Sequence, residues 1–442
     1  MNIFIPEYAR KAMEILVGNG FQAYAVGGCI RDSLLGKTPQ DWDICTDCLP
    51  EKLKEVFKGY RTIDTGLKHG TVTVLIGTEL VEITTFRSDG EYENHRKPEQ
   101  VRFVSELQED LIRRDFTVNA MCCDINCKIY DFCGGRDDLK SGIIRCVGKA
   151  EKRFEEDALR ILRGLRFASV LDFQIEVETA KAMFEKKELL KFISAERISE
   201  ELKKLLCGKA VEKILVEYGE ILGAVIPEIL PCIGFEQNNP HHCYTVWEHI
   251  AKSVSLVRPD PVIRTVMLLH DIAKPKMKTV DESGIYHFKK HQYVGAEMAK
   301  EILKRLKYDN RSADYIFRLI WEHDNRIPAQ VSSVKRFISK HDFQFYFDYL
   351  EVRRGDTYAQ SDFRLREKLD ELDELAKIGL DLYAQDCCLK VSDLAINGND
   401  LIELGLCGKE IGEWLDRILE LVIDDRISND KNELLDYIRE HR

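Results

Sequence analysis

The chain has 442 residues, of which 44% are hydrophobic and 32% are charged. This length is too great for a single hydrophobic core and predicts roughly two to four domains. No apolar run reaches the ~18 residues that a membrane-spanning helix needs, and the first residues carry no basic leader with a cleavage site, so a membrane-bound or exported chain is not expected. The formal net charge of -11 argues against non-specific nucleic-acid binding by the whole chain. The charge is unevenly distributed, however, because residues 361–442 carry 21 acids and 11 bases, whereas residues 140–170 carry 8 bases and 4 acids. Local binding of phosphate by the basic region therefore stays open.

The first 145 residues alternate strand-like and helical patterns, which indicates an α/β unit. The strands are expected at Ala23–Val26, Trp42–Cys45, Thr71–Ile76, Val81–Phe86 and Met121–Ile125, and the helices at Pro6–Val17, Arg31–Leu35 and Glu51–Phe57. From about Glu151 the apolar spacing is helical, with breaks at Pro227–Pro240 and near Asn397. The fourteen cysteines, in a long chain without a secretory signal, indicate reduced, buried thiols in a cytoplasm.

The stretch Val26–Cys45, VGGCIRDSLLGKTPQDWDIC, combines a glycine pair, a cation and two aspartates. In a strand, Asp41 and Asp43 point to the same face, where their carboxylates repel each other unless a cation, usually a divalent metal, lies between them. A glycine turn before Arg31 brings backbone N–H groups and positive charge up to phosphate. The stretch therefore predicts a combined metal and nucleotide site.

Three further motifs follow in the order found in one enzyme family. They are EDLIRRDFTVNAM at Glu109–Met121, YDFCGGRDDL at Tyr130–Leu139 and RFEEDALRILRGLRF at Arg153–Phe167. Together with the first stretch, they resemble class II tRNA nucleotidyltransferases and bacterial poly(A) polymerases, which belong to the DNA polymerase β superfamily. The resemblance implies an α+β fold: a nucleotidyltransferase (DNA polymerase β-like) α/β head at 1–145, an all-helical neck with a nucleotide-selecting motif at 146–205, an HD-type helical body at 206–365 and a helical tRNA-binding tail at 366–442.

Such an enzyme joins an RNA 3′-hydroxyl to the α-phosphate of a nucleoside triphosphate and releases pyrophosphate. Two Mg²⁺ ions would stabilise the attacking and leaving oxygens, with Asp41 and Asp43 as the catalytic ligands. Glu82, on a neighbouring predicted strand, is either a third metal ligand or a strand-edge charge. The expected triphosphate contacts are the backbone of Gly28 and the guanidinium groups of Arg31 and Arg114.

The fourth motif predicts how the base is selected. On one helix, Asp157, Arg160 and Arg163 would lie on nearby faces, with Arg166 as a further nucleotide contact. A carboxylate accepts from an exocyclic amino group, which cytosine and adenine offer where uracil and guanine offer a carbonyl oxygen. The protein would therefore select CTP and ATP without a nucleic-acid template. Taken alone, the motif also fits a helix surface of salt bridges.

The segment Arg87–Gln108 resembles the flexible loop that CCA-adding relatives carry and CC-adding relatives shorten. Asp64–Gly77, DTGLKHGTVTVLIG, lacks the basic and aromatic character typical of poly(A) polymerases. Both features favour the addition of C, C and A to the 3′ end of tRNA, a cytoplasmic process, and the sequence gives no signal for an oligomeric state. The alternatives are a poly(A) polymerase, an enzyme that adds only CC or only A, and an RNA-binding protein without catalysis.

A second site is indicated in the helical region. His249, His270-Asp271, His291, His323 and Asp356 follow the order H…HD…H…H…D, which resembles the HD phosphohydrolase superfamily. Imidazole and carboxylate ligands suit a transition metal or magnesium. The resemblance implies a second divalent metal held by His249, His270, Asp271 and Asp356. Two outcomes remain open: phosphohydrolase activity, or an HD fold kept only as a helical body that grips tRNA.

The last segment has glycine turns between helical patterns, at Gly398, Gly405, Gly408 and Gly412. It resembles the C-terminal segment with which this family meets the tRNA elbow. Helix N-termini preceded by glycine turns can bind phosphate without lysine, which would reconcile the acidic tail with an RNA partner. A plain helical cap on the body is the alternative.

Overall fold

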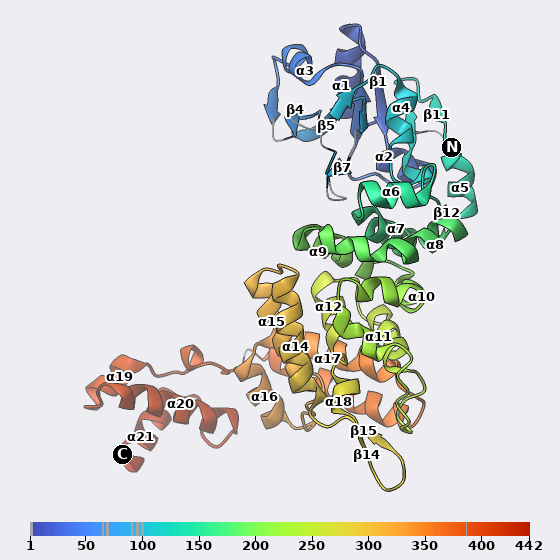
Figure 1. Ribbon diagram of the computed structural model, residues 1–442. Helices are drawn as coiled ribbons and strands as arrows, with labels where there is room; N and C mark the ends of the chain where they lie inside the picture. The colour runs from blue at the N-terminus through green and yellow to red at the C-terminus, as the bar shows by residue number, and fades with distance from the viewer. Residues whose placement is uncertain are drawn as a thin grey trace. The chain divides into compact units, whose positions relative to one another are not determined.

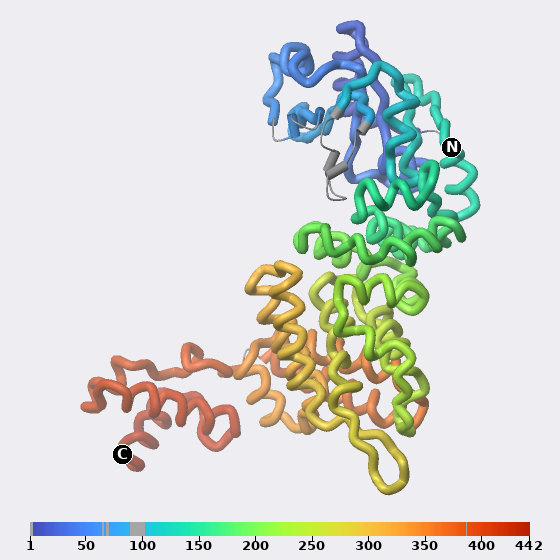
Figure 2. The backbone as a smooth tube through the Cα atoms, viewed as in Figure 1, coloured from blue at the N-terminus to red at the C-terminus, as the bar shows by residue number. Residues whose placement is uncertain are grey.

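The computed structural model describes residues 3–63, 66–67, 70–89, 92–93, 97–98, 101–385 and 387–442. The chain forms two compact units, one of Met1–Leu230 with Arg305–Lys307 and one of Pro231–Lys304 with Tyr308–Arg442. Figure 1 shows a mixed head at the N-terminus followed by helices, and residues outside the described ranges are grey in Figure 2. The predicted α+β class is confirmed, whereas the finer division into four domains stays a prediction.

A mixed sheet forms the centre of the head. Among the described residues it has seven strands in the order β11-β10-β1-β2-β5-β4-β3. Their bounds are β1 Ala23–Val26, β2 Asp43–Thr46, β3 Arg61–Ile63, β4 Thr71–Ile76, β5 Glu79–Thr85, β10 Met121–Cys123 and β11 Ile129–Asp131. β1 and β4 have the predicted bounds, β2 begins one residue later, and β3 and β11 were not predicted.

Strand register brings the first motif together. β1 pairs antiparallel with β2, so that Val26 lies opposite Asp43, and β2 pairs parallel with β5 through Ile44 and Ile83. The alternation of β4, with Val72, Val74 and Ile76 buried, fits a sheet that has one face against the core. Helix α1 (Glu7–Gly18) packs against β1 and β5 (Figure 1).

Short helices link the strands of the head, and longer ones follow it. Those of the head are α2 Gly28–Leu34, α3 Pro50–Val56, α4 Leu107–Ile112, η2 Thr117–Asn119 and α5 Gly135–Ser141. Those after it are α6 Ala150–Glu156, α7 Leu159–Leu171, α8 Val177–Lys186, η3 Lys187–Phe192, α9 Ala195–Leu206 and α10 Val211–Gly223. The remaining short strands of this unit are β6 Arg87–Asp89, β7 Tyr92–Glu93, β8 Lys97–Pro98, β9 Val101–Phe103, β12 Ile143–Ile144 and β13 Gln174–Ile175.

The predicted flexible loop Arg87–Gln108 includes residues 90–91, 94–96 and 99–100, which lie outside the described residues. Its described ends pair antiparallel as β6 and β9. The predicted flexibility of the loop, and its part in CCA addition, stay predictions.

Helix α7 carries the fourth motif and is held by close packing. Its apolar side chains recur at helical spacing and are buried. Gly164 lies where a Cβ would be 2.3 Å from Cε of Met183 and 2.9 Å from Cζ of Phe116. Only glycine allows these neighbours to approach α7 so closely, and α9 packs against the same helix.

The second unit is helical, apart from one hairpin among its described residues. Its elements are η4 Pro227–Cys232 at the boundary, α11 Val246–Ser255, α12 Pro261–Leu269, α13 Lys274–Met277, β14 Thr279–Val280, β15 Tyr286–His287, α14 His291–Arg305, α15 Asn310–Glu322, α16 Val331–Lys340, α17 Phe343–Tyr358 and α18 Leu365–Ala384. The predicted break at Pro227–Pro240 is confirmed, because regular helix resumes only at α11, where Thr245 and Glu248 form a capping box.

The tail consists of η5 Val391–Asp393, α19 Gly398–Glu403, α20 Lys409–Ile423 and α21 Lys431–His441. The predicted break near Asn397 is confirmed, since Asn397 caps the start of α19. Leu401, Ile418, Leu434 and Ile438 are fully buried in a hydrophobic cluster formed by the tail itself.

All fourteen cysteines are free thiols, but the prediction that they are buried is wrong for Cys243 and Cys407, which are exposed. Within the described ranges, no helix is long and apolar enough to cross a membrane.

Candidate functional site

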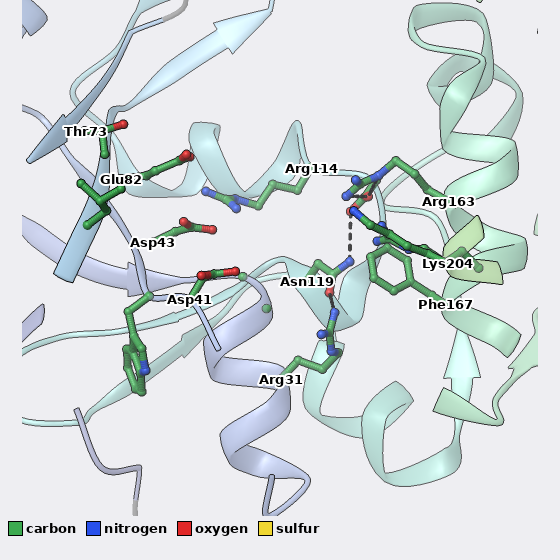
Figure 3. Close-up of a pocket in the computed structure, with 16 residues that line it drawn as sticks. Arg31, Asp41, Asp43, Thr73, Glu82, Arg114, Asn119, Arg163, Phe167 and Lys204 are labelled. Carbon is green, nitrogen blue, oxygen red and sulfur yellow. Dashed lines mark hydrogen bonds and ion pairs between the residues drawn. The ribbon is translucent and has the colours of Figure 1, made fainter. Parts of the chain in front are cut away.

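A cavity of 690 Å³ in the first unit joins the first, second and fourth motifs (Figure 3). The carboxylates of Asp41, Asp43 and Glu82 line one side of it. The cationic lining residues are Arg31, Arg114, Arg163, Arg166 and Lys204. Gly27, Gly28, Trp42, Asp115, Asn119 and Phe167 also line it. The cavity therefore has an acidic side suited to cations and a basic side suited to phosphate.

A glycine turn sets the floor of this cavity. Gly27 has φ +83°, which L side chains rarely adopt, and a Cβ on it would lie 3.3 Å from Nη1 of Arg114. The chain turns there from β1 into α2, whose first residue is Gly28 and which carries Arg31. Glycine is needed at position 27 both for the backbone conformation and for the approach of Arg114.

The acidic side comes from neighbouring strands. Asp43 begins β2 and Glu82 lies on the adjacent β5, while Asp41 precedes β2. In Figure 3 the three carboxylates point toward the same space. Loss of solvation, then the charges of Glu82 and Asp41, raise the pKa of Asp43 to about 6 against the opposing effect of Arg114. Such repulsion is relieved by a cation.

Glu82 reaches the cavity, as predicted for a third acid. Among the described residues, however, the three carboxylates do not form a compact three-ligand cluster. A contact between Glu82 and a metal ion therefore stays a prediction.

The arginines of the cavity are held by carboxylates. Arg31 pairs with Asp32 at 2.8 Å and also donates to Oδ1 of Asn119 at 2.7 Å. Arg114 pairs with the buried Asp110 at 3.0 Å. Because these partners fix the guanidinium groups, the donors are oriented before any substrate binds.

The two arginines of α7 are fixed in the same way. Arg163 pairs with Asp115 at 2.6 Å, and Arg166 pairs with Glu201 of α9 at 3.1 Å. Burial lowers the pKa of Arg166 to about 10, with a further decrease from Arg163. The guanidinium of Arg166 lies 4.1 Å from the ring centre of Phe167.

The other two residues of the base-selecting motif lie elsewhere. The prediction that Asp157 shares one helix with Arg160 and Arg163 is wrong, because the chain breaks at Asp157, where the backbone is extended (φ -138°, ψ 103°) between α6 and α7. The Asp157 carboxylate pairs with Arg197 at 2.8 Å. Neither Asp157 nor Arg160 lines the cavity.

Arg160 is buried, with 8% exposure, and pairs with Glu156 at 2.7 Å. It also donates to the backbone carbonyl of Arg113. Of the four predicted base-selecting residues, only Arg163 and Arg166 line the cavity, and base selection by Asp157 and Arg160 stays a prediction.

Sequence reasoning missed several lining residues. Asp115 and Asn119 belong to the quoted motif Glu109–Met121, which was the available signal. Phe167 likewise ends the quoted motif Arg153–Phe167. The contributions of Lys204 and of Glu201, the partner of Arg166, depend on the packing of α9 against α7, which no local pattern reveals.

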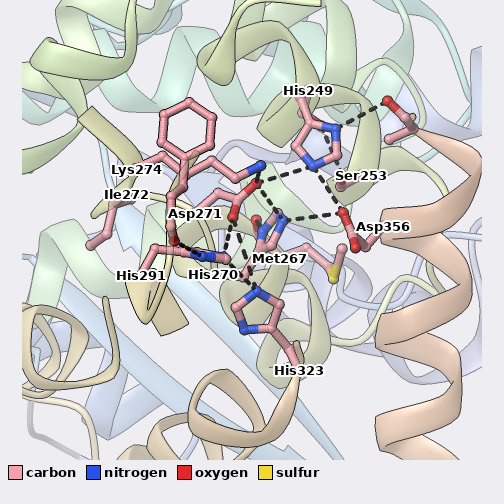
Figure 4. Close-up of polar contacts among 12 residues, drawn as sticks. His249, Ser253, Met267, His270, Asp271, Ile272, Lys274, His291, His323 and Asp356 are labelled. Atoms are coloured by element: carbon pink, nitrogen blue, oxygen red, sulfur yellow. Dashed lines mark hydrogen bonds and ion pairs between the residues drawn. The ribbon is translucent and has the colours of Figure 1, made fainter. Parts of the chain in front are cut away.

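The HD residues form a second, buried cluster in the other unit (Figure 4). Nε2 of His249 lies 3.2 Å from Asp271 and 3.0 Å from Asp356, and Nε2 of His270 lies 3.2 Å from Asp271. On the other side of Asp271, Nε2 of His291 lies 3.0 Å from Oδ1 and 3.3 Å from Nε2 of His323. The structure thus brings together all four predicted HD ligands, and beside them His291 and His323 of the same sequence pattern.

Each imidazole is oriented by a backbone carbonyl. The Nδ1 atoms of His249, His270, His291 and His323 lie 2.7–3.0 Å from the carbonyl oxygens of Ala359, Met267, Phe288 and Ile320. We assign a proton to Nδ1 from these contacts, which directs each Nε2 atom into the cluster. Within the described residues, Nε2 of His249 and Nε2 of His270 are buried without a hydrogen bond, while Oδ2 of Asp271 pairs with Nζ of Lys274 at 2.7 Å.

The two carboxylates of the cluster stabilise positive charge on the groups beside them. Although burial lowers it, Asp271 and Asp356 raise the pKa of His270 to about 10. Burial, with the nearby His270 and His291, lowers the pKa of His323 to about 3. Two groups with metal-ligand geometry result, His249–His270–Asp271–Asp356 and Asp271–His291–His323, which share Asp271.

The comparisons with known proteins agree along the chain. The family model described as the Poly A polymerase head domain matches residues 23–145. The probable RNA and SrmB-binding site of polymerase A matches residues 172–232, and a putative tRNA nucleotidyltransferase domain 2 matches residues 285–438.

Relatives extend over the same regions. The chain is 34% identical to the CCA-adding enzyme of Lactobacillus helveticus over 99% of this chain and 98% of the relative. It is 50% identical to the CCA-adding enzyme of Lactococcus lactis subsp. lactis over 46% of this chain and 51% of the relative. The crystal structure of the Bacillus stearothermophilus CCA-adding enzyme in complex with CTP matches with a TM-score of 0.76 and 29% identity, over 99% of this chain and 98% of that one. On this evidence the chain belongs to the CCA-adding enzymes, a family of tRNA nucleotidyltransferases.

Proposed function

We propose that the cavity adds C, C and A to the 3′ end of tRNA from CTP and ATP, without a nucleic-acid template and with divalent metal, most simply Mg²⁺. The observation that carries the proposal is a cavity in which carboxylates face pre-oriented arginines, in a chain of this family. Phosphoryl transfer needs little more from a protein than such positioning and charge stabilisation.

Asp41 and Asp43 are the proposed metal ligands, with Glu82 as a third acid. The raised pKa of Asp43 supports this assignment, because the carboxylates repel one another and favour a bound cation. A bound pair of divalent ions supplies charge stabilisation to the attacking 3′-oxygen and the leaving pyrophosphate.

The chain's own groups bind and orient the nucleotide. Arg31 and Arg114 are the proposed triphosphate contacts beside the Gly28 backbone, since they lie on the cavity side that faces the carboxylates. Asn119, which accepts from Arg31, holds that guanidinium in place.

Base selection is proposed for the fourth motif, with Arg163 and Arg166 at the cavity and Asp157 and Arg160 completing the set. In this proposal Asp157 accepts from the amino group of cytosine or adenine and the arginines donate to ring acceptors. The ion pair of Asp157 with Arg197 means that a base must compete with a guanidinium for that carboxylate.

The test uses three tRNA transcripts that end before CCA, after C and after CC. Each is incubated with Mg²⁺ and CTP, ATP or both, and product lengths are read at single-nucleotide resolution. Three additions to the first transcript followed by a stop support the proposal. Addition of only two C residues, or of A only to the CC end, indicates that this chain carries out one part of CCA addition. Long A tails favour a poly(A) polymerase. Asp41→Asn with Asp43→Asn is expected to abolish every addition.

A second candidate function, metal-dependent phosphohydrolysis, is favoured by the two ligand groups that share Asp271. Four buried imidazoles whose Nε2 atoms face two carboxylates fit one or two divalent cations. A bound cation supplies a nucleophilic water at neutral pH, and Lys274, 2.7 Å from Asp271, adds a positive charge for phosphate. Hydrolysis of a phosphate ester that survives Asp41→Ala with Asp43→Ala but is lost with His270→Ala would support this function.

A cytoplasmic location follows from these proposals, because the substrates are intracellular nucleotides and tRNA. Cell fractionation followed by immunodetection tests it.

A further inference from the structure

The cations that line the transferase cavity fall into two classes. Each of the four arginines has a carboxylate partner: Asp32 for Arg31, Asp110 for Arg114, Asp115 for Arg163 and Glu201 for Arg166. Lys204 lines the same cavity, yet it makes no ion pair with any residue that the structure describes. Its positive charge is the one in the lining that no described carboxylate neutralises.

Lys204 is exposed on α9, three residues after Glu201 and therefore on the same side of the helix. Glu201 is buried and neutralises Arg166, whereas Lys204 reaches the solvent side of the cavity. Figure 3 shows Lys204 beside Arg163 and Phe167, on the side opposite the three carboxylates.

This position separates Lys204 from the place of the triphosphate. The reacting phosphates must lie near Asp41 and Asp43, and Arg31 and Arg114 are the cations that face them. The second substrate, an RNA 3′ end, is also anionic and must enter from solvent. A lysine is a flexible point charge, which suits a single backbone phosphate rather than bidentate recognition.

We propose that Lys204 binds a backbone phosphate in the 3′-terminal strand of the RNA that enters the cavity. This inference rests on the proposed transfer of nucleotides to tRNA. Lys204 is an RNA-binding residue in it, not a catalytic one, and its contact is to the sugar–phosphate backbone, so it is the same at each of the three additions.

The test compares Lys204→Ala with Lys203→Ala in the full-length protein. Lys203 is its neighbour on α9 but pairs with Glu200 at 3.6 Å and does not line the cavity. Binding of tRNA without CCA is measured over a range of salt concentrations, and KM is measured separately for tRNA and for CTP. The charge-conserving Lys204→Arg is the third variant.

We expect Lys204→Ala to weaken tRNA binding about two- to fivefold, the size of one exposed ion pair. It should lower the slope of log affinity against log salt by about 0.7, the value for one phosphate of a single strand. KM for CTP should stay unchanged, Lys204→Arg should restore binding, and Lys203→Ala should bind tRNA like the wild type.

Three results would overturn the inference. One is a change in KM for CTP without a change in tRNA binding, which would assign Lys204 to the nucleotide. Another is an equal loss of tRNA affinity in Lys203→Ala, which would indicate that any positive charge on α9 attracts RNA and that Lys204 makes no specific contact. The third is an unchanged salt slope. A wild-type protein that adds no nucleotide to any transcript would instead refute the proposed function, so the two failures are distinguishable.

Discussion

The turn at Gly27 offers a direct test of how the backbone positions the phosphate-binding arginine. Alanine at this position meets two costs. The backbone has φ +83° and ψ -126°, a conformation that costs a non-glycine residue about 1–3 kcal/mol. The new Cβ would also lie 3.3 Å from Nη1 of Arg114, so that this guanidinium must move by a few tenths of an ångström.

Gly20 provides a matched control. It has nearly the same φ, +86°, but a Cβ there would meet no atom within 4 Å, and Gly20 does not line the cavity. Gly20→Ala should therefore lose about 1–2 kcal/mol of stability from the backbone alone. Gly27→Ala should lose a similar amount and also displace Arg114.

The two effects are separated by measuring denaturant midpoints and the steady-state kinetics of C addition. Both variants should unfold at lower denaturant concentration. Only Gly27→Ala should lower kcat/KM for CTP, by about tenfold or more, because a charge-assisted hydrogen bond to phosphate contributes about 1.5–3 kcal/mol. A Gly27→Ala enzyme with wild-type kcat/KM for CTP would refute the assignment of Arg114 to the triphosphate.

Three further predictions concern the two sites. Because the pKa of Asp43 is raised to about 6, Mg²⁺ affinity in a titration of C addition should increase as pH rises through about 6. Without Mg²⁺, the folded state should lose stability from pH ~4 to ~6 as this carboxyl ionises. Asp43→Asn should remove that loss of stability in thermal melts with EDTA. His270→Ala should lower the bound transition-metal content measured by elemental analysis, whereas His441→Ala, which changes an exposed histidine at the end of α21, should leave it unchanged; equal metal content in both variants would contradict an HD metal site. Asp157→Ala should reduce the preference for CTP over UTP at least tenfold, as expected when a hydrogen-bonded substrate group loses its partner, and competition assays with retained preference would assign base selection to other residues.

Sequence patterns were sufficient where a motif is local. Asp41 and Asp43 share a cavity with Arg31 because a turn, a helix and a hairpin-like strand pair fix them within one short stretch. β3 and β11 were missed because each has three residues without full burial, so that neither carries a periodic apolar signal.

The break at Asp157 was missed for a different reason. The helical apolar spacing continues across it from Phe154 to Leu165, and only the backbone geometry separates α6 from α7. The partners of two cavity arginines, Arg163 and Arg166, could not be predicted either, because Asp115 and Glu201 lie 48 and 35 residues away from them in the sequence.

The pairing of every cavity arginine has a consequence for how the enzyme distinguishes its substrates. A guanidinium that already holds a carboxylate binds a second anion only with the donors that remain, so nucleotide phosphates and base acceptors must match fixed directions. Lys204, without such a partner, imposes no direction and attracts any phosphate that reaches the rim. Geometry would therefore select the nucleotide, which must be C or A, while charge alone would hold the RNA, whose terminal residues change with each addition.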